Sequence, residues 1–290
     1  MKIRLPLFTA AVLLLPSLAL LLSNQDWPQA NIIGGNVALP ALFSSIALLA
    51  ITSLLDTLSF RRSGSSLLRT QRLYTFGLSV TGAVLCALLA CLNIFSPLWV
   101  SPLSRPAEIL LGAFFGSLLL PAVLVMRLWL SGFPALLRGL TRTLALPAAQ
   151  AEPVAALLLL ATLVGLLGGT VWPTQLGWLL WLSPLMLLIA LQLLWHESSV
   201  FSGLKNGDWS RVILGAASGI LVSGSTLSIY KLTGGALYIT TSAWLFTLLL
   251  AAFGLLCLQL GDVIAEQWRG KKRADVFKRK PFPIPVVTKD

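Results

Sequence analysis

The chain has 290 residues, of which 57% are hydrophobic and only 11% are charged, and its formal net charge at pH 7 is +11. A soluble domain carries roughly 25% charged residues, so this chain has too few charges to cover a water-facing surface. The basic residues lie in short segments between apolar runs, a pattern that argues against nucleic-acid binding. We therefore predict an all-α, polytopic integral membrane protein that is surrounded by membrane lipids.

Eight apolar runs are each long enough to cross a bilayer as a helix. The first, at about 5–22, lacks a small-x-small cleavage site, so we interpret it as an uncleaved helix rather than a signal peptide. Asp56 is expected to end the second run. The sequence thus predicts an eight-helix transmembrane domain over 1–260 and a basic cytoplasmic tail over 261–290. The remaining seven runs lie at about 37–55, 74–92, 107–130, 153–171, 176–195, 212–230 and 237–260.

The distribution of lysine and arginine predicts the orientation of the helices. If the N-terminus lies inside, then all but Arg105, Arg127 and Lys231 of the 21 basic residues fall in inside segments. Basic residues concentrate in the inside loops of membrane proteins. We therefore expect both termini inside, in a bacterial cytoplasmic (inner) membrane.

Most of the tryptophans fall near the predicted ends of the spans, where aromatic side chains form belts at the membrane interface. We interpret them as belt residues without a further function. Those near the outer boundary are Trp27, Trp99, Trp172 and Trp178, and those near the inner boundary are Trp129, Trp195, Trp209 and Trp268.

Two pairs of small residues predict close helix packing. Gly112 and Gly116 lie four residues apart in the fourth run, and Gly215 and Gly219 do so in the seventh. This spacing lets two helix backbones approach closely. We expect the contacts to be intramolecular rather than a dimer face.

No predicted span carries an acidic or basic residue near its middle, which disfavours an ion-coupled transporter. His196 is the single histidine and cannot supply both axial ligands of a haem, and no metal site or catalytic constellation is visible. The three cysteines form no C-x-x-C pair, so a disulfide framework or zinc site is also not predicted. Hydroxyl groups of the seventh run could line a polar cavity, although such groups more often bond to the backbone. These hydroxyls belong to Ser223, Ser225, Thr226 and Ser228.

Glu108 opens the fourth run on the predicted outer side. A carboxylate in the first turn of a helix is favoured by the helix dipole, which is one sufficient reason for its position. It also lies at the depth of a quinol headgroup, where it could accept a proton from a quinol hydroxyl. Arg105 is the neighbouring cation that would keep this carboxylate ionised.

Segments on both sides of this loop resemble a known family. Residues 91–97 read CLNIFSP and residues 102–110 read PLSRPAEIL. They resemble the LHLGxP and SWLSREIL stretches of the DMSO reductase membrane anchor subunit family, with Asn93 at the position of that family's histidine. Residues 208–214 and 261–266 are similar to its WRxxLL helix start and its GELIGR ending.

The resemblance implies an anchor subunit that binds menaquinol or ubiquinol and passes electrons to an iron–sulfur subunit and a molybdopterin subunit. Its quinol-binding site would consist of Glu108, Arg105 and Asn93. The chain itself would have no catalytic residues. Basic residues of the tail would dock a partner or lipid headgroups, among them Arg269, Lys271, Lys272 and Arg273.

Two other classes of function stay open from the sequence. The first is a permease for a small solute or a lipid, which needs a polar cavity between the helices. The second is a non-catalytic protein that assembles or scaffolds a membrane complex, which needs no site.

Overall fold

A computed structural model describes residues 37–64, 66–141, 144–146, 151–195 and 199–268. The predicted helix at 5–22, His196 and the four basic tail residues that start at Arg269 lie outside the described residues.

Seven long apolar helices in the described part of the chain are able to cross a membrane, which confirms an all-α, multi-pass membrane bundle. The fourth of them is interrupted by a π-helical turn, η1, between α7 and α8. Each helix begins and ends within a few residues of its predicted run, except at the two points described below. The spanning elements are α2 (Ala38–Ser63), α4 (Arg72–Phe95), α5 (Arg105–Ser131), α7 (Ala151–Leu163) with η1 (Val164–Gly168) and α8 (Gly169–Val171), α9 (Pro173–Leu194), α10 (Ser210–Leu232) and α11 (Ala243–Trp268).

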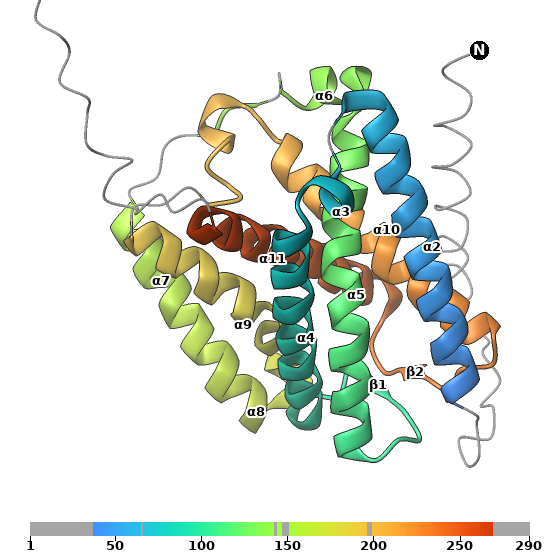
Figure 1. The fold of residues 1–290 in the computed structure, drawn as a ribbon. Coiled ribbons are helices and arrows are strands. Elements are labelled where there is room, and N and C mark those ends of the chain that lie inside the picture. The colour runs from blue at the N-terminus through green and yellow to red at the C-terminus, as the bar shows by residue number, and fades with distance from the viewer. Residues whose placement is uncertain (1–36, 65, 142–143, 147–150, 196–198, 269–290) are drawn as a thin grey trace, which may run out of the picture.

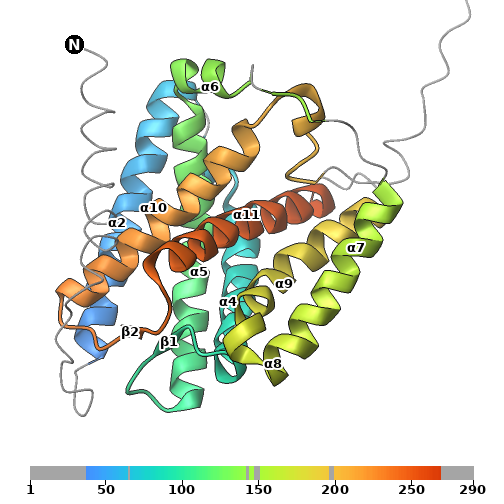
Figure 2. The same ribbon diagram turned by 180° about the vertical axis from the view of Figure 1, so that it is seen from behind.

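Short elements connect these helices. The connecting elements are α3 (Leu67–Thr70), α6 (Pro134–Leu140), η2 (Leu204–Asn206), β1 (Trp99–Val100) and β2 (Tyr238–Ile239). Helices α4 and α5 pack against each other, as do α7 and α9, and α10 and α11 (Figure 1). Seen from behind, α10 and α11 cross obliquely over the α2, α4 and α5 layer (Figure 2).

Glycines allow two of these pairs to pack backbone against backbone, which confirms that their small-residue spacing serves intramolecular contacts. A Cβ atom on Gly116 of α5 would overlap the carbonyl oxygen of Gly82 in α4. A Cβ atom on Gly219 of α10 would lie 2.5 Å from the Cα of Gly254 in α11. Close approach of this kind increases dispersion contact where the lipid gives no hydrophobic driving force.

The prediction that Asp56 ends the second helix is wrong. Asp56 lies inside α2, which continues to Ser63. The helix ends where Gly64 adopts a positive φ of 69°, a conformation that glycine allows without strain. The Asp56 side chain is buried and accepts hydrogen bonds from Ser66 Oγ and from the backbone N–H of Leu67, at 2.5 and 2.8 Å. The carboxylate therefore holds the start of α3 against α2.

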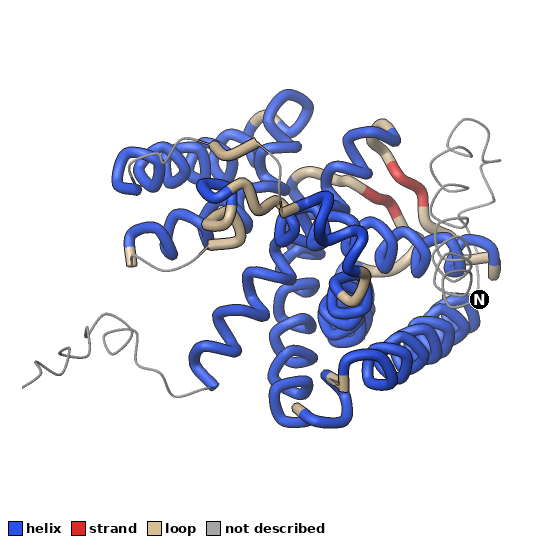
Figure 3. The backbone as a smooth tube through the Cα atoms, turned by 90° about the horizontal axis from the view of Figure 1, so that it is seen from above, coloured by secondary structure: helices blue, strands red, loops and turns tan. Residues whose placement is uncertain are grey.

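The eighth predicted run also differs from the structure, because its first residues form β2 rather than helix. Strand β2 pairs antiparallel with β1, with Trp99 opposite Ile239 (Figure 3). The Thr240 N–H extends the pairing by donating to the Leu98 carbonyl at 3.0 Å. Helix α11 begins only at Ala243 and then continues past the predicted boundary at residue 260.

Candidate functional site

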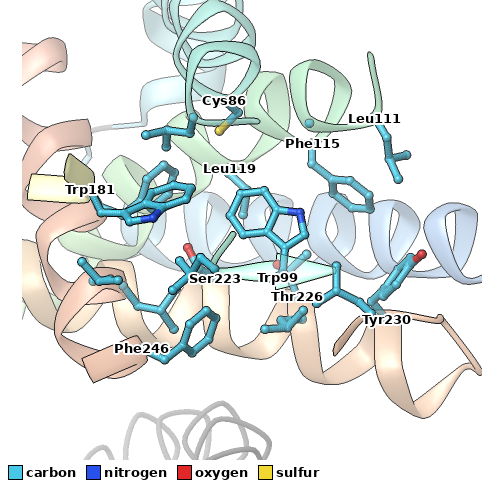
Figure 4. A pocket seen from close by; sticks show the side chains of 18 of the residues that line it. Cys86, Trp99, Leu111, Phe115, Leu119, Trp181, Ser223, Thr226, Tyr230 and Phe246 are labelled. Atoms are coloured by element: carbon cyan, nitrogen blue, oxygen red, sulfur yellow. The ribbon is translucent and has the colours of Figure 1, made fainter. Parts of the chain in front are cut away.

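A cavity of about 280 Å³ lies at the end of the bundle that carries β1 and β2. Five helices contribute to its wall, namely α4, α5, α9, α10 and α11, together with the loop around β1. Its surface is mostly leucine and aromatic side chains (Figure 4). Small-molecule sites in proteins are typically apolar cavities of roughly 300–1,000 Å³ with a few polar groups. This cavity has about the size of one substituted ring.

Glu108 lies at the cavity wall in the first turn of α5 and is only 8% exposed. Its Oε1 atom accepts hydrogen bonds from Trp99 Nε1 at 2.6 Å and from Asn93 Nδ2 at 3.2 Å. Its Oε2 atom faces the guanidinium of Arg105 at 3.5 Å. Three donors therefore compensate the cost of removing this carboxylate from water.

Asn93 connects the carboxylate to the backbone of the loop that follows α4. Its side chain is fully buried and also donates to the Trp99 carbonyl at 2.9 Å. Its Oδ1 atom accepts from the N–H groups of Leu98 and Trp99, at 2.8 and 3.3 Å. One amide thus fixes the loop, β1 and the orientation of Glu108.

The Glu108 carboxylate keeps capacity for another donor. An ionised carboxylate offers about four lone-pair sites, and the three contacts occupy three of them. The Arg105 side chain is 59% exposed, so it connects the buried carboxylate to the outside of the bundle. A ligand hydroxyl in the cavity can therefore donate to this group.

Aromatic rings form two sides of the cavity. The Trp99 and Trp181 rings lie 5.3 Å apart at an interplanar angle of 50°. Phe115 and Tyr230, which also line the cavity, meet edge to face at 6.4 Å. The Trp181 indole is held by a hydrogen bond to the Ser96 carbonyl at 3.2 Å. Flat rings with fixed orientation favour a flat aromatic or quinoid ligand.

Two hydroxyl groups at the cavity have no hydrogen-bond partner among the described residues. Ser101 Oγ, after β1, and Ser223 Oγ, on α10, are buried and make no hydrogen bond with any described residue. A buried polar group without a partner costs about 1–3 kcal/mol. These hydroxyls are therefore positioned to bond to a ligand or to water.

The other hydroxyls of α10 behave as expected for a membrane helix. Thr226 and Ser228 donate to the carbonyls of Val222 and Gly224, both at 2.8 Å. Helix α10 is also the most buried of the described spans. These hydroxyls thus bond to the backbone of their own helix, whereas Ser223 Oγ does not.

The structure brings all three predicted site residues, Glu108, Arg105 and Asn93, into one hydrogen-bonded cluster. The sequence interpretation did not include Trp99 in the site, although its indole N–H donates to Glu108. Its position in the short loop between Asn93 and Glu108 was the available signal. Ser223 was among the hydroxyls that the sequence indicated for a cavity, whereas Ser101 and Trp181 gave no local signal. No cluster of three or more metal-ligating side chains occurs among the described residues.

No protein-family model matches the chain, and no curated protein or solved structure matches it either.

Proposed function

We propose that this protein binds a quinol in the cavity beside Glu108, as the membrane anchor subunit of a multi-subunit oxidoreductase in the bacterial cytoplasmic membrane. The observation that carries the proposal is an aromatic cavity with polar groups at separate points of its wall. These groups are the Glu108 carboxylate and the unpaired hydroxyls of Ser101 and Ser223.

A quinol matches this arrangement in shape and in hydrogen bonding. Its ring is flat and apolar, and its two oxygens lie at opposite positions of the ring. One hydroxyl would donate to Glu108, and the other oxygen would bond to a serine hydroxyl. The cavity is large enough for the ring only, so the isoprenoid tail would extend into the surrounding lipid.

Proton release in this proposal runs through Glu108. Oxidation of a quinol frees two protons with two electrons. The Glu108 carboxylate, within hydrogen-bond reach, would accept the first proton, release it, and then accept the second. Arg105 lies at the exposed side of the carboxylate, so the proton would leave toward the predicted outer surface.

The electrons would pass to the iron–sulfur subunit of the complex, and from there to a molybdopterin subunit. The cavity lies at the β1–β2 end of the bundle, so the cluster that accepts the electrons would have to dock at that end. In this proposal the basic tail, which starts near the opposite end of α11, contacts lipid headgroups instead. Purification in mild detergent followed by identification of co-purifying subunits tests the assembly.

Binding is tested by titrating the purified protein with a short-chain benzoquinone or naphthoquinone and following tryptophan fluorescence. Trp99 and Trp181 line the cavity, so a bound quinone should quench them. Loss of one hydrogen bond of about 0.5–1.5 kcal/mol should weaken binding roughly twofold to tenfold in Ser223→Ala. Glu108→Gln keeps the shape of the side chain but should abolish quinol-dependent electron transfer.

Ser117→Ala is the matched control, because Ser117 lies on α5 with an exposed hydroxyl that donates to the Phe114 carbonyl. It should bind quinone as the unmodified protein does. Absence of saturable quenching, or equal affinity in the Ser223, Glu108 and Ser117 variants, would refute a quinone site in this cavity.

A further inference from the structure

A second and larger cavity, of about 860 Å³, lies at the opposite end of the α4–α5 pair. It is formed by the first turn of α4, the last turns of α5 and the C-terminal part of α11. Tyr74 of α4 closes one side by donating from its hydroxyl to the Gly261 carbonyl at 2.9 Å. By the predicted orientation, this end of the bundle lies inside the cell.

The cavity has an excess of positive charge. Arg69, Arg72 and Arg127 contribute to its wall, and Asp262 is its one carboxylate among the described residues. Asp262 already forms an ion pair with Arg211. Arg127 also lies within electrostatic range of this carboxylate. One negative charge cannot neutralise the two guanidinium groups, so positive charge remains.

The guanidinium group of Arg127 has a donor without a partner among the described residues. Its Nε atom is buried and makes no hydrogen bond to any residue that the structure describes. A guanidinium group carries five N–H donors, which suit phosphate oxygens. Arg127 lies about one turn before the end of α5, at the end of this span that the predicted orientation places inside.

The first turn of α4 adds a second feature that favours an anion. This helix has 24 residues and no side-chain hydrogen bond at its N-cap, Gln71. N–H groups in the first turn of a helix lack partners within the helix, and the helix dipole favours negative charge there. Arg72, at the start of α4, is exposed at the rim of the cavity.

We propose that this inner cavity binds a phosphate group, carried by an anionic membrane phospholipid. The wall of the cavity also contains Leu73, Leu124 and Leu128, which suit the glycerol and upper acyl chain of a lipid. A free phosphate ion would fill only a small part of 860 Å³ and would not need these leucines.

The test uses the full-length protein in mild detergent, with native mass spectrometry to count retained lipids and thermal unfolding to measure stabilisation. Phosphatidylglycerol should be retained and should raise the unfolding temperature, whereas phosphatidylcholine should be lost. Arg127→Gln should weaken phosphatidylglycerol binding about tenfold, as expected for a hydrogen bond between charged groups.

Three further arms make the result specific. Because Arg127 is partly buried, Arg72→Gln at the exposed rim gives a second test, with a loss of roughly threefold, since an exposed charge contributes up to about 1 kcal/mol. Arg138→Gln removes an exposed positive charge of α6, which does not line this cavity, and should leave retention unchanged. Inorganic phosphate alone, if it stabilises the protein as much as the lipid does, would overturn the lipid assignment in favour of a soluble anion.

Equal retention of the two lipids, or unchanged retention in both the Arg127 and Arg72 variants, would overturn the phosphate site itself. Neither outcome bears on the quinone cavity, which lies at the other end of the bundle and is probed by different variants.

Discussion

At the scale of single residues, Asn93 makes the most side-chain hydrogen bonds in the cluster of Asn93, Glu108 and Arg105. It is fully buried and bonds to Leu98, Trp99 and Glu108 through both ends of its amide. Asparagine satisfies two donors and two acceptors at once, which a histidine in its place could not do. The amide therefore connects the end of α4 to the start of α5.

Asn93→Ala should lower the free energy of unfolding by about 1–3 kcal/mol, because it leaves buried backbone and carboxylate groups without partners. The thermal midpoint in detergent measures this effect. Gln175→Ala is the control, since Gln175 is an exposed amide that bonds only to the neighbouring Thr174 side chain. A midpoint equal to that of the control would contradict the role given to Asn93.

The cluster of Asn93, Glu108 and Arg105 could be predicted from the sequence. Two spans joined by one short outer loop must place the end of the first beside the start of the second. The sequence also named Ser223 as a hydroxyl that could line a cavity, but not that Ser101 lines the same cavity, because this depends on how α10 packs across the α4–α5 pair. Contacts over such separations leave no periodic signal in the sequence.

At the scale of elements, the α4–α5 pair depends on the absence of side chains at Gly82 and Gly116. Gly116→Ala should lower the free energy of unfolding by about 1–3 kcal/mol, because the added methyl group meets a backbone carbonyl that cannot move aside easily. The midpoint of thermal unfolding reports the change.

Gly139→Ala in α6 is the matched control, since nothing lies within 4 Å of the Cβ position there. Alanine is the better helix former, so this variant should be neutral or slightly stabilised. If both alanine variants had the same midpoint, close packing at Gly116 would not contribute to stability.

Element boundaries were predictable where an apolar run meets a charge or a proline, as at Pro173 and Arg105. The boundary predictions were wrong where contacts between segments distant in the sequence determined the structure. Asp56 is a charged residue at the end of an apolar run, where a helix would be expected to end. Its carboxylate, however, accepts a hydrogen bond from the start of α3, and the helix continues. Residues 237–242 are apolar enough to extend a helix, yet part of this segment pairs with β1 as a strand.

At the scale of the whole molecule, charge predicts which end faces the cytoplasm. Cysteines introduced at Gly139, in α6, and at Thr233, after α10, lie at exposed positions of opposite ends. In a background without Cys86, Cys91 and Cys257, an impermeant maleimide added to intact cells should label Thr233→Cys but not Gly139→Cys. Labelling of Gly139→Cys alone would invert the orientation.

The paired strands β1 and β2 also affect how a ligand would enter the cavity beside Glu108. Leu98, Trp99 and Leu237 from the strand segments form its wall at the outer end, where water would otherwise meet the ligand. In the proposed function, a quinol would then enter from the bilayer rather than from water, and its occupancy would follow its mole fraction in the lipid phase. Twice the amount of lipid or detergent at a fixed amount of quinone would halve that mole fraction, so affinities should be expressed per lipid rather than per litre.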